Sequence, residues 1–167
     1  MFPYSTVINP RLERLLAEYR ESHQNKINVL IHWLFEPLAI WAVFALFWNL
    51  PIPVGIAGIP GLNGMTLLVL CLLAYFAWLS PPIAIVLTFF AVIFSYLVTL
   101  VVASITIPVW QLALPLFAAS WIALLLGHRI EGNYPSVFKN PHMIFIGPVW
   151  LLIKTGLVRQ RHGPLGE

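Results

Sequence analysis

Residues 64–105 read GMTLLVLCLLAYFAWLSPPIAIVLTFFAVIFSYLVTLVVASI and contain no Asp, Glu, Lys or Arg. The charge-free region continues on both sides, over residues 37–128, so the nine basic and six acidic residues all lie in 1–36 or 129–167. The whole chain is 60% hydrophobic and 9% charged, whereas a soluble domain is about 25% charged. A transmembrane helix needs roughly 20 residues, and the pattern therefore predicts an all-α integral membrane bundle with about four transmembrane helices.

Turn-forming residues divide the charge-free region into separate apolar runs. Residues 50–63 are rich in Pro and Gly, and Ser80-Pro81-Pro82 interrupts the apolar sequence that follows, as is typical of loops. We expect the whole chain, 1–167, to form one membrane-embedded domain. Its expected spans are about 29–49, 64–79, 83–105 and 109–127.

Two further segments flank the expected spans. Residues 10–23 place apolar side chains at helical spacing among charged ones, which predicts an amphipathic helix on the membrane surface. Residues 142–158 are apolar but short, and Gly147 and Pro148 interrupt them. We expect the second segment to be interfacial or re-entrant rather than a fifth span.

The basic residues predict how the chain is oriented. Four of them precede the first span, whereas the loops at 50–63 and 106–108 contain none. The positive-inside rule then places the N-terminus in the cytoplasm, and four passes return the chain to that side after residue 128. Three histidines would therefore lie at one face of the membrane: His23, His32 and His128.

The stretch at 22–32, SHQNKINVLIH, contains two histidines, His23 and His32. On one straight helix the nine-residue step between them turns the chain by about 900°, half a turn out of register. The two imidazoles can share a metal only if the helix breaks between them. Residues 24–26 are polar and suit such a break, and we expect Asn28 to be the N-cap of the next helix. The alternative is that both histidines are ordinary polar residues at the membrane boundary.

Polar residues reappear after the fourth span, in the stretch GHRIE at 127–131. If the helix continues, His128 and Glu131 share a face. Glu131 is then a metal ligand, a group that orients an imidazole, or a plain helix-end residue. Imidazoles bind Fe, Zn, Cu and Ni, and ionisable groups at membrane depth are functional candidates. A metal site formed by the histidines is therefore one hypothesis, and ordinary polar residues at the membrane boundary are the other.

Two motifs flank the predicted spans: Tyr19-x3-His23-x4-Asn28-x3-His32, and Gly127-His128 followed by Glu131-x-Asn133-x-Pro135-Ser136-x-Phe138. Together, over roughly residues 8–155, they resemble the membrane-bound 2-hydroxy fatty acid dioxygenases, whose fungal members act in phytosphingosine metabolism. The resemblance implies an Fe(II)-dependent oxidoreductase that performs α-oxidation. Such an enzyme converts a long-chain 2-hydroxy fatty acid and O2 into the fatty acid one carbon shorter.

The resemblance also implies that the three histidines bind iron, and position adds further candidates. The expected metal ligands are His23, His32, His128 and His142. The expected catalytic residues are Asn28 and Glu131. From charge and position alone, we expect the substrate carboxylate to be bound by Arg20, Arg129 and Lys139.

The expected partners are a 2-hydroxy fatty acid, O2 and membrane lipid, and a homo-oligomer is an open alternative. No nucleic acid is expected, because the basic residues flank the apolar region instead of interleaving with aromatic residues. The membrane would be the inner membrane in a bacterium or the endoplasmic reticulum in a fungus, with the metal site on the cytoplasmic side. Two other classes stay open: a haem-binding electron carrier with two histidine axial ligands, and a non-enzymatic scaffold or transporter.

Overall fold

The computed structural model of the chain describes residues 10–138 and 140–156, and for residues 141 and 142 it describes the backbone alone. All secondary structure in these residues is helical, as the sequence predicts. The elements are α1 (Pro10–Glu21), α2 (Lys26–Trp48), α3 (Gly64–Leu79), α4 (Pro81–Ser104), α5 (Trp110–Glu131), η1 (Ser136–Phe138), η2 (Pro141–Phe145) and α6 (Ile146–Lys154).

Three helices, α2, α4 and α5, are long and apolar enough to cross a membrane, with mean hydropathies of 1.9, 2.7 and 1.6. Helix α3 is also apolar but has 16 residues. Its length is about 24 Å at 1.5 Å per residue, less than the roughly 30 Å of a hydrocarbon core. The membrane-bundle class is therefore confirmed, whereas the count of four spans stays a prediction.

The helix boundaries lie close to those expected from the turn residues, and the differences have local causes. Helix α4 begins at Pro81, because proline is favoured at the first position of a helix. Helix α5 continues to Glu131 and ends at Gly132, whose φ of 78° is the left-handed conformation that closes many helices. This extension brings His128 into the last turns of α5.

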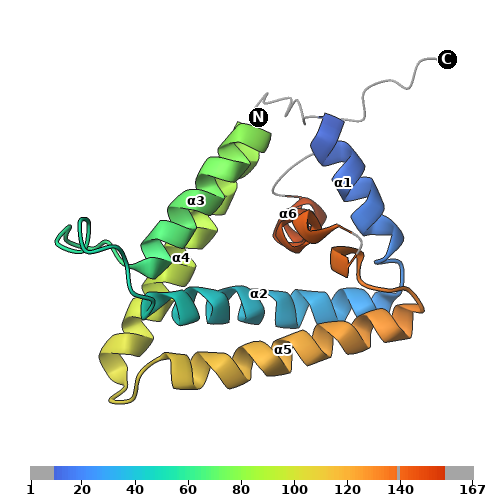
Figure 1. The fold of residues 1–167 in the computed structure, drawn as a ribbon. Helices are drawn as coiled ribbons and strands as arrows, with labels where there is room; N and C mark the ends of the chain where they lie inside the picture. The colour runs from blue at the N-terminus through green and yellow to red at the C-terminus, as the bar shows by residue number, and fades with distance from the viewer. Residues whose placement is uncertain (1–9, 139, 157–167) are drawn as a thin grey trace.

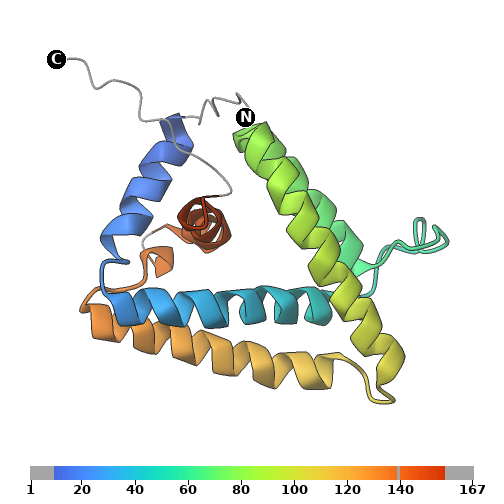
Figure 2. The same cartoon turned by 180° about the vertical axis from the view of Figure 1, so that it is seen from behind.

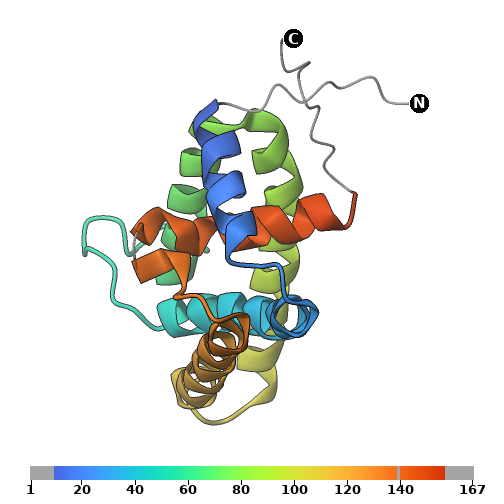
Figure 3. The same ribbon diagram turned by 90° about the vertical axis from the view of Figure 1, so that its right-hand side faces the viewer.

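The helices form two antiparallel pairs that lie at an angle to each other. Helices α2 and α5 lie side by side along most of their length, and α3 and α4 form the second pair (Figure 1). The view from behind shows the two pairs meeting at the C-terminal end of α2 (Figure 2). Helix α1 rises from the other end of α2, and α6 lies across the space between α1 and the α3–α4 pair (Figures 1 and 3).

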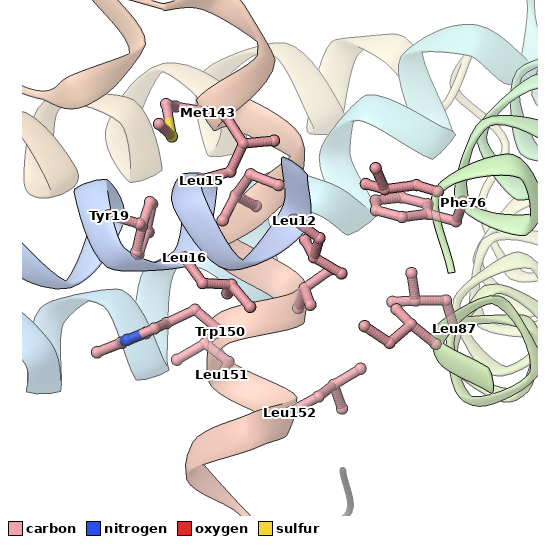
Figure 4. Packing of buried hydrophobic residues seen from close by; sticks show 14 of the residues in the cluster. Leu12, Leu15, Leu16, Tyr19, Phe76, Leu87, Met143, Trp150, Leu151 and Leu152 are labelled. Carbon is pink, nitrogen blue, oxygen red and sulfur yellow. The ribbon is translucent and has the colours of Figure 1, made fainter. Parts of the chain in front are cut away.

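The apolar stripe of α1 packs inside the protein. Leu12 and Leu16 are almost fully buried, and with Tyr19 they face α6 in one cluster with Trp150 (Figure 4). Helices α3 and α4 close the same cluster with side chains that include Phe76 (Figure 4). Burying one such side chain contributes about 1.5–3 kcal/mol, so this cluster holds α1 and α6 against the membrane-length helices.

Many large apolar side chains on the outer helix faces are exposed, among them Trp78, Ile85 and Phe89. Contiguous apolar surface of this kind is unusual on a water-soluble monomer. A helix that is hydrophobic all round belongs in a membrane or in the core of a large protein. The exposed apolar faces of α3 and α4 therefore agree with the membrane-bundle class.

Candidate metal centre

The helix is interrupted between His23 and His32, as it must be if the two imidazoles are to bind one metal ion. Helix α1 ends at Glu21 and α2 begins at Lys26. Asn25 is the N-cap of α2, because its side-chain oxygen accepts a hydrogen bond of 2.8 Å from the Ile27 N–H. The prediction that Asn28 caps this helix is wrong, since Asn25 already takes that place and Asn28 lies inside the first turn.

Three imidazoles converge at the end of the α2–α5 pair. His23 lies at the break before α2, His32 in α2 and His128 in α5, and they are 3%, 4% and 6% exposed. Their potential ligand atoms all lie within 4.8 Å of one another. The three rings are nearly perpendicular in each pair, with interplanar angles of 83–84°.

Backbone carbonyls orient two of these rings. The Nδ1 of His23 lies 2.7 Å from the carbonyl oxygen of Tyr19, and the Nδ1 of His32 lies 3.0 Å from that of Asn28. A carbonyl can only accept, so each Nδ1 carries the proton and each Nε2 carries a lone pair. Histidine ligands of metals are commonly held in this way by a second hydrogen bond.

The free nitrogens fit a bound cation. The Nε2 atoms of His23 and His32 face each other at 3.1 Å, and two lone pairs at that distance cannot form a hydrogen bond. Two nitrogens that each lie about 2.1 Å from one metal ion are separated by roughly 3.0–3.4 Å. A cation between them would turn a repulsive contact into a favourable one.

Burial and electrostatics favour the same interpretation. Burial first, and then the neighbouring His32, lower the pKa of His23 to about 3, so this ring is neutral at physiological pH. The Nδ1 of His128 is buried and has no hydrogen-bond partner among the described residues. A buried polar atom without a partner costs free energy unless a ligand binds it. Three neutral imidazoles are a donor set that suits Fe, Zn, Cu or Ni.

Glu131 binds the loop between α1 and α2. Its carboxylate accepts hydrogen bonds of 2.8 Å from the backbone N–H groups of Gln24 and Asn25, and one of 3.1 Å from Nδ2 of Asn28. Asn28 also donates to the carbonyl of Ser22 at 3.1 Å. Glu131 thus fastens the loop that carries His23 to the helix that carries His128, and it lies outside the cluster of ligand atoms.

A glycine allows α2 and α5 to approach at this point. A Cβ at Gly127 would lie 2.5 Å from Oδ1 of Asn28, closer than side chains tolerate. Because Gly127 has no side chain, Asn28 fits between the two helices and reaches both Ser22 and Glu131.

The remaining expected site residues lie apart from the three imidazoles or outside the described residues. Arg20 is exposed and lines a hollow with His23, Lys26 and Lys154. Arg129 is exposed. Lys139 lies outside the described residues, as does the side chain of His142, whose backbone belongs to η2.

An apolar cavity of about 400 Å³ reaches two of the three imidazoles. His32 and His128 line one part of it, and nearly all its other lining residues are apolar side chains from α2 to α6. Its volume falls in the range of about 300–1,000 Å³ that is typical of small-molecule sites.

Two residues of this cavity are absent from the expected site residues. Tyr19 stacks on His23, with ring centroids 3.9 Å apart and planes at 10°, and its hydroxyl donates to Oε2 of Glu36 at 3.5 Å. Glu36 has a signal in the sequence: it is the one charged residue within the expected span at 29–49. A charge at that depth is costly and therefore indicates function.

The comparison with protein families agrees with the two motifs. The family model described as "2-hydroxy-palmitic acid dioxygenase Mpo1-like" matches residues 10–159. The chain belongs to this family. The matched region includes all three converging histidines. No curated protein and no solved structure matches the chain significantly.

The geometry disfavours the haem-carrier alternative. Two axial histidines must lie on opposite faces of the macrocycle, whereas the Nε2 atoms of His23 and His32 are 3.1 Å apart and His128 lies beside both rings. This leaves no room for a porphyrin between them.

Proposed function

We propose that this protein is an iron(II)-dependent membrane dioxygenase that shortens long-chain 2-hydroxy fatty acids by one carbon. The observation that carries the proposal is the convergence of three buried imidazoles at one end of an apolar cavity. The family description, which names a 2-hydroxy-palmitic acid dioxygenase, supports the same substrate class.

The proposed ligands are His23, His32 and His128. When bound, iron(II) would supply the redox chemistry by which O2 reacts with the 2-hydroxy acid. Three protein ligands leave coordination positions open, as O2-activating iron sites require. The carbonyls of Tyr19 and Asn28 keep two Nε2 atoms directed at the centre.

The reaction balances with O2 alone. C1 of the 2-hydroxy acid leaves as CO2, and C2 becomes the carboxyl carbon of the shorter acid. This oxidation releases four electrons, which reduce O2 fully, so that one water forms beside the two carbon products. No external reductant or organic co-substrate is needed.

The cavity would hold the alkyl chain of the substrate beside the imidazoles. Each buried CH2 group contributes about 0.8 kcal/mol, so an apolar cavity of this size selects long chains over short ones. The carboxylate would lie toward Arg20 and Lys26, which line a hollow together with His23. We further propose that the site faces the cytoplasm, on the strength of the basic N-terminal segment.

Metal analysis and turnover test the proposal. Purified protein should contain iron or take up Fe(II), and with O2 it should convert 2-hydroxypalmitate into pentadecanoic acid and CO2. The His128→Gly variant should lose iron and activity, and added imidazole should restore part of both because it can fill the space that the side chain leaves. A wild-type protein with neither bound metal nor the shortened acid would contradict the proposal.

A further inference from the structure

Glu36 places a carboxyl group in the wall of the apolar cavity. It lies one helical turn after His32 on the same face of α2, and it is 8% exposed. Among the described residues that line the cavity it is the one carboxylate. Burying a carboxyl group among apolar side chains costs free energy unless it has partners, so its presence calls for a function.

Among the described residues, one oxygen of this carboxyl has a hydrogen-bond partner and the other has none. The Tyr19 hydroxyl donates to Oε2, and no donor in the described part of the chain bonds Oε1. A phenol hydroxyl has one proton to donate, and Tyr19 directs it to Oε2. The unpartnered Oε1 is therefore the atom that can accept a hydrogen bond from a ligand.

Helix α6 leaves space for the carboxyl. A Cβ at Gly147 would overlap Oε1 of Glu36 and would lie 2.6 Å from its carboxyl carbon. Tyr19 of α1 and Gly147 of α6 thus surround a side chain of α2. Three separate elements hold this one polar group beside His32.

We propose that Glu36 determines specificity by accepting a hydrogen bond from the 2-hydroxyl group of the fatty acid in the cavity. This inference rests on the proposed function, because it takes the 2-hydroxy acid as the ligand. Residues four apart on a helix have Cβ atoms about 5–6 Å apart, so a head group held beside His32 lies within reach of Glu36. As a carboxylate, Glu36 accepts the hydrogen bond of the 2-hydroxyl at Oε1. If the carboxyl is protonated, Oε1 carries the proton and bonds the oxygen of the same hydroxyl as donor, so the contact forms in both ionisation states.

An acid that lacks the 2-hydroxyl would leave Oε1 without a partner. Losing one such hydrogen bond corresponds to roughly a tenfold loss in affinity. The cavity should therefore bind 2-hydroxypalmitate more tightly than palmitate, even without metal. Tyr19 acts as a positioning residue, since it holds the carboxyl in the orientation that exposes Oε1.

Equilibrium binding to full-length, chelator-treated protein tests this inference. Radiolabelled palmitate is bound first and then displaced by unlabelled palmitate or 2-hydroxypalmitate. Glu36→Met removes both oxygens at similar length and should abolish the preference for the hydroxy acid while palmitate still binds. Gly147→Ala leaves Glu36 intact but displaces its carboxyl, and it should reduce the preference. Glu21→Met, at an exposed position of α1, is the matched control and should bind as wild type.

Two results would overturn the inference: equal binding of the two acids by the wild type, or an unchanged preference in both Glu36→Met and Gly147→Ala. Because binding is measured without metal, this outcome is independent of turnover. A protein that prefers the hydroxy acid but forms no shortened product would support the role of Glu36 and contradict the dioxygenase proposal.

Discussion

At the scale of single residues, the immediate neighbours of His23 determine the protonation state of its imidazole. His23 lies four residues after Tyr19, stacks on its ring and donates to its carbonyl. These contacts bury the imidazole, and burial disfavours the charged form. We therefore expect the contacts that bury His23 to make the metal-free folded protein sensitive to acid.

The first prediction concerns the stability of the metal-free protein at acid pH. The pKa of His23 is lowered to about 3 in the folded state, whereas an unfolded histidine titrates near pH 6.5. Below about pH 6.5 the unfolded chain binds a proton that the folded chain does not. The contribution of His23 to stability is thus complete above that pH and declines as the pH falls toward 3.

Thermal unfolding in detergent measures this effect. The melting temperature of the metal-free wild type should fall between pH 7.5 and pH 4.5, and His23→Gln should show a smaller fall because Gln does not titrate. If the melting temperatures of the two proteins fell equally over this pH range, groups other than His23 would be responsible for the loss of stability in acid.

At the scale of elements, the site depends on the contacts that fix the loop between α1 and α2. Residues 22–25 separate α1 from α2, and two backbone N–H groups of this loop donate to Glu131 at the end of α5. A carboxylate that accepts several hydrogen bonds fixes its donors strongly. The position of His23 relative to His128 therefore depends on Glu131.

The second prediction is that Glu131→Ala weakens iron binding without removing a ligand. The loop N–H groups lose their acceptor, and the affinity for Fe(II) should fall by about 10–100-fold, the cost of losing a supporting hydrogen-bond partner at a metal site. Titration of metal-free protein with Fe(II) measures this loss. Glu131→Gln keeps one acceptor oxygen and should be intermediate.

Glu13→Ala, an exposed position of α1, is the control and should bind iron as the wild type does. Unchanged affinity in Glu131→Ala would contradict the role of this carboxylate. A complete loss that excess Fe(II) does not reverse would instead make Glu131 a ligand.

At the scale of the whole molecule, the cavity exists because the two helix pairs diverge and α6 lies between them. No single helix contains it. Its walls come from α2 to α6 and from Tyr19 of α1, so its length is a property of the packed bundle.

The third prediction tests whether the substrate chain lies in this cavity. Ala91 of α4 lines the cavity and is buried, so Ala91→Phe should shorten the accessible space. The preference of the enzyme for 2-hydroxypalmitate over 2-hydroxydecanoate should fall roughly tenfold or more, since each excluded CH2 group costs about 0.8 kcal/mol.

Product analysis by chain length measures this preference. The matched control is Val92→Phe, because Val92 is the next residue of α4 and is 61% exposed. It adds the same ring on the outer face and should leave the preference unchanged. An unchanged preference in Ala91→Phe would place the alkyl chain elsewhere.

The membrane class, the approximate helices and the convergence of His23, His32 and His128 could be predicted from the sequence. The reason is that charge distribution and helical periodicity are local properties of the chain. The spacing of His23 and His32 also required a break between them, and the structure has one at residues 22–25. The cap was assigned to Asn28 instead of Asn25, because both are good cap residues and only the backbone geometry separates them.

Other features depended on residues far apart in the sequence. Gln24 and Glu131 are 107 positions apart, and Tyr19 meets Glu36 only after α1 folds back over α2. Composition and spacing alone determined a helical membrane protein with histidines at one end. Only the tertiary structure decided that Glu131 fastens the loop and that Glu36 faces the cavity, because such contacts follow from the packing of whole helices and not from local sequence.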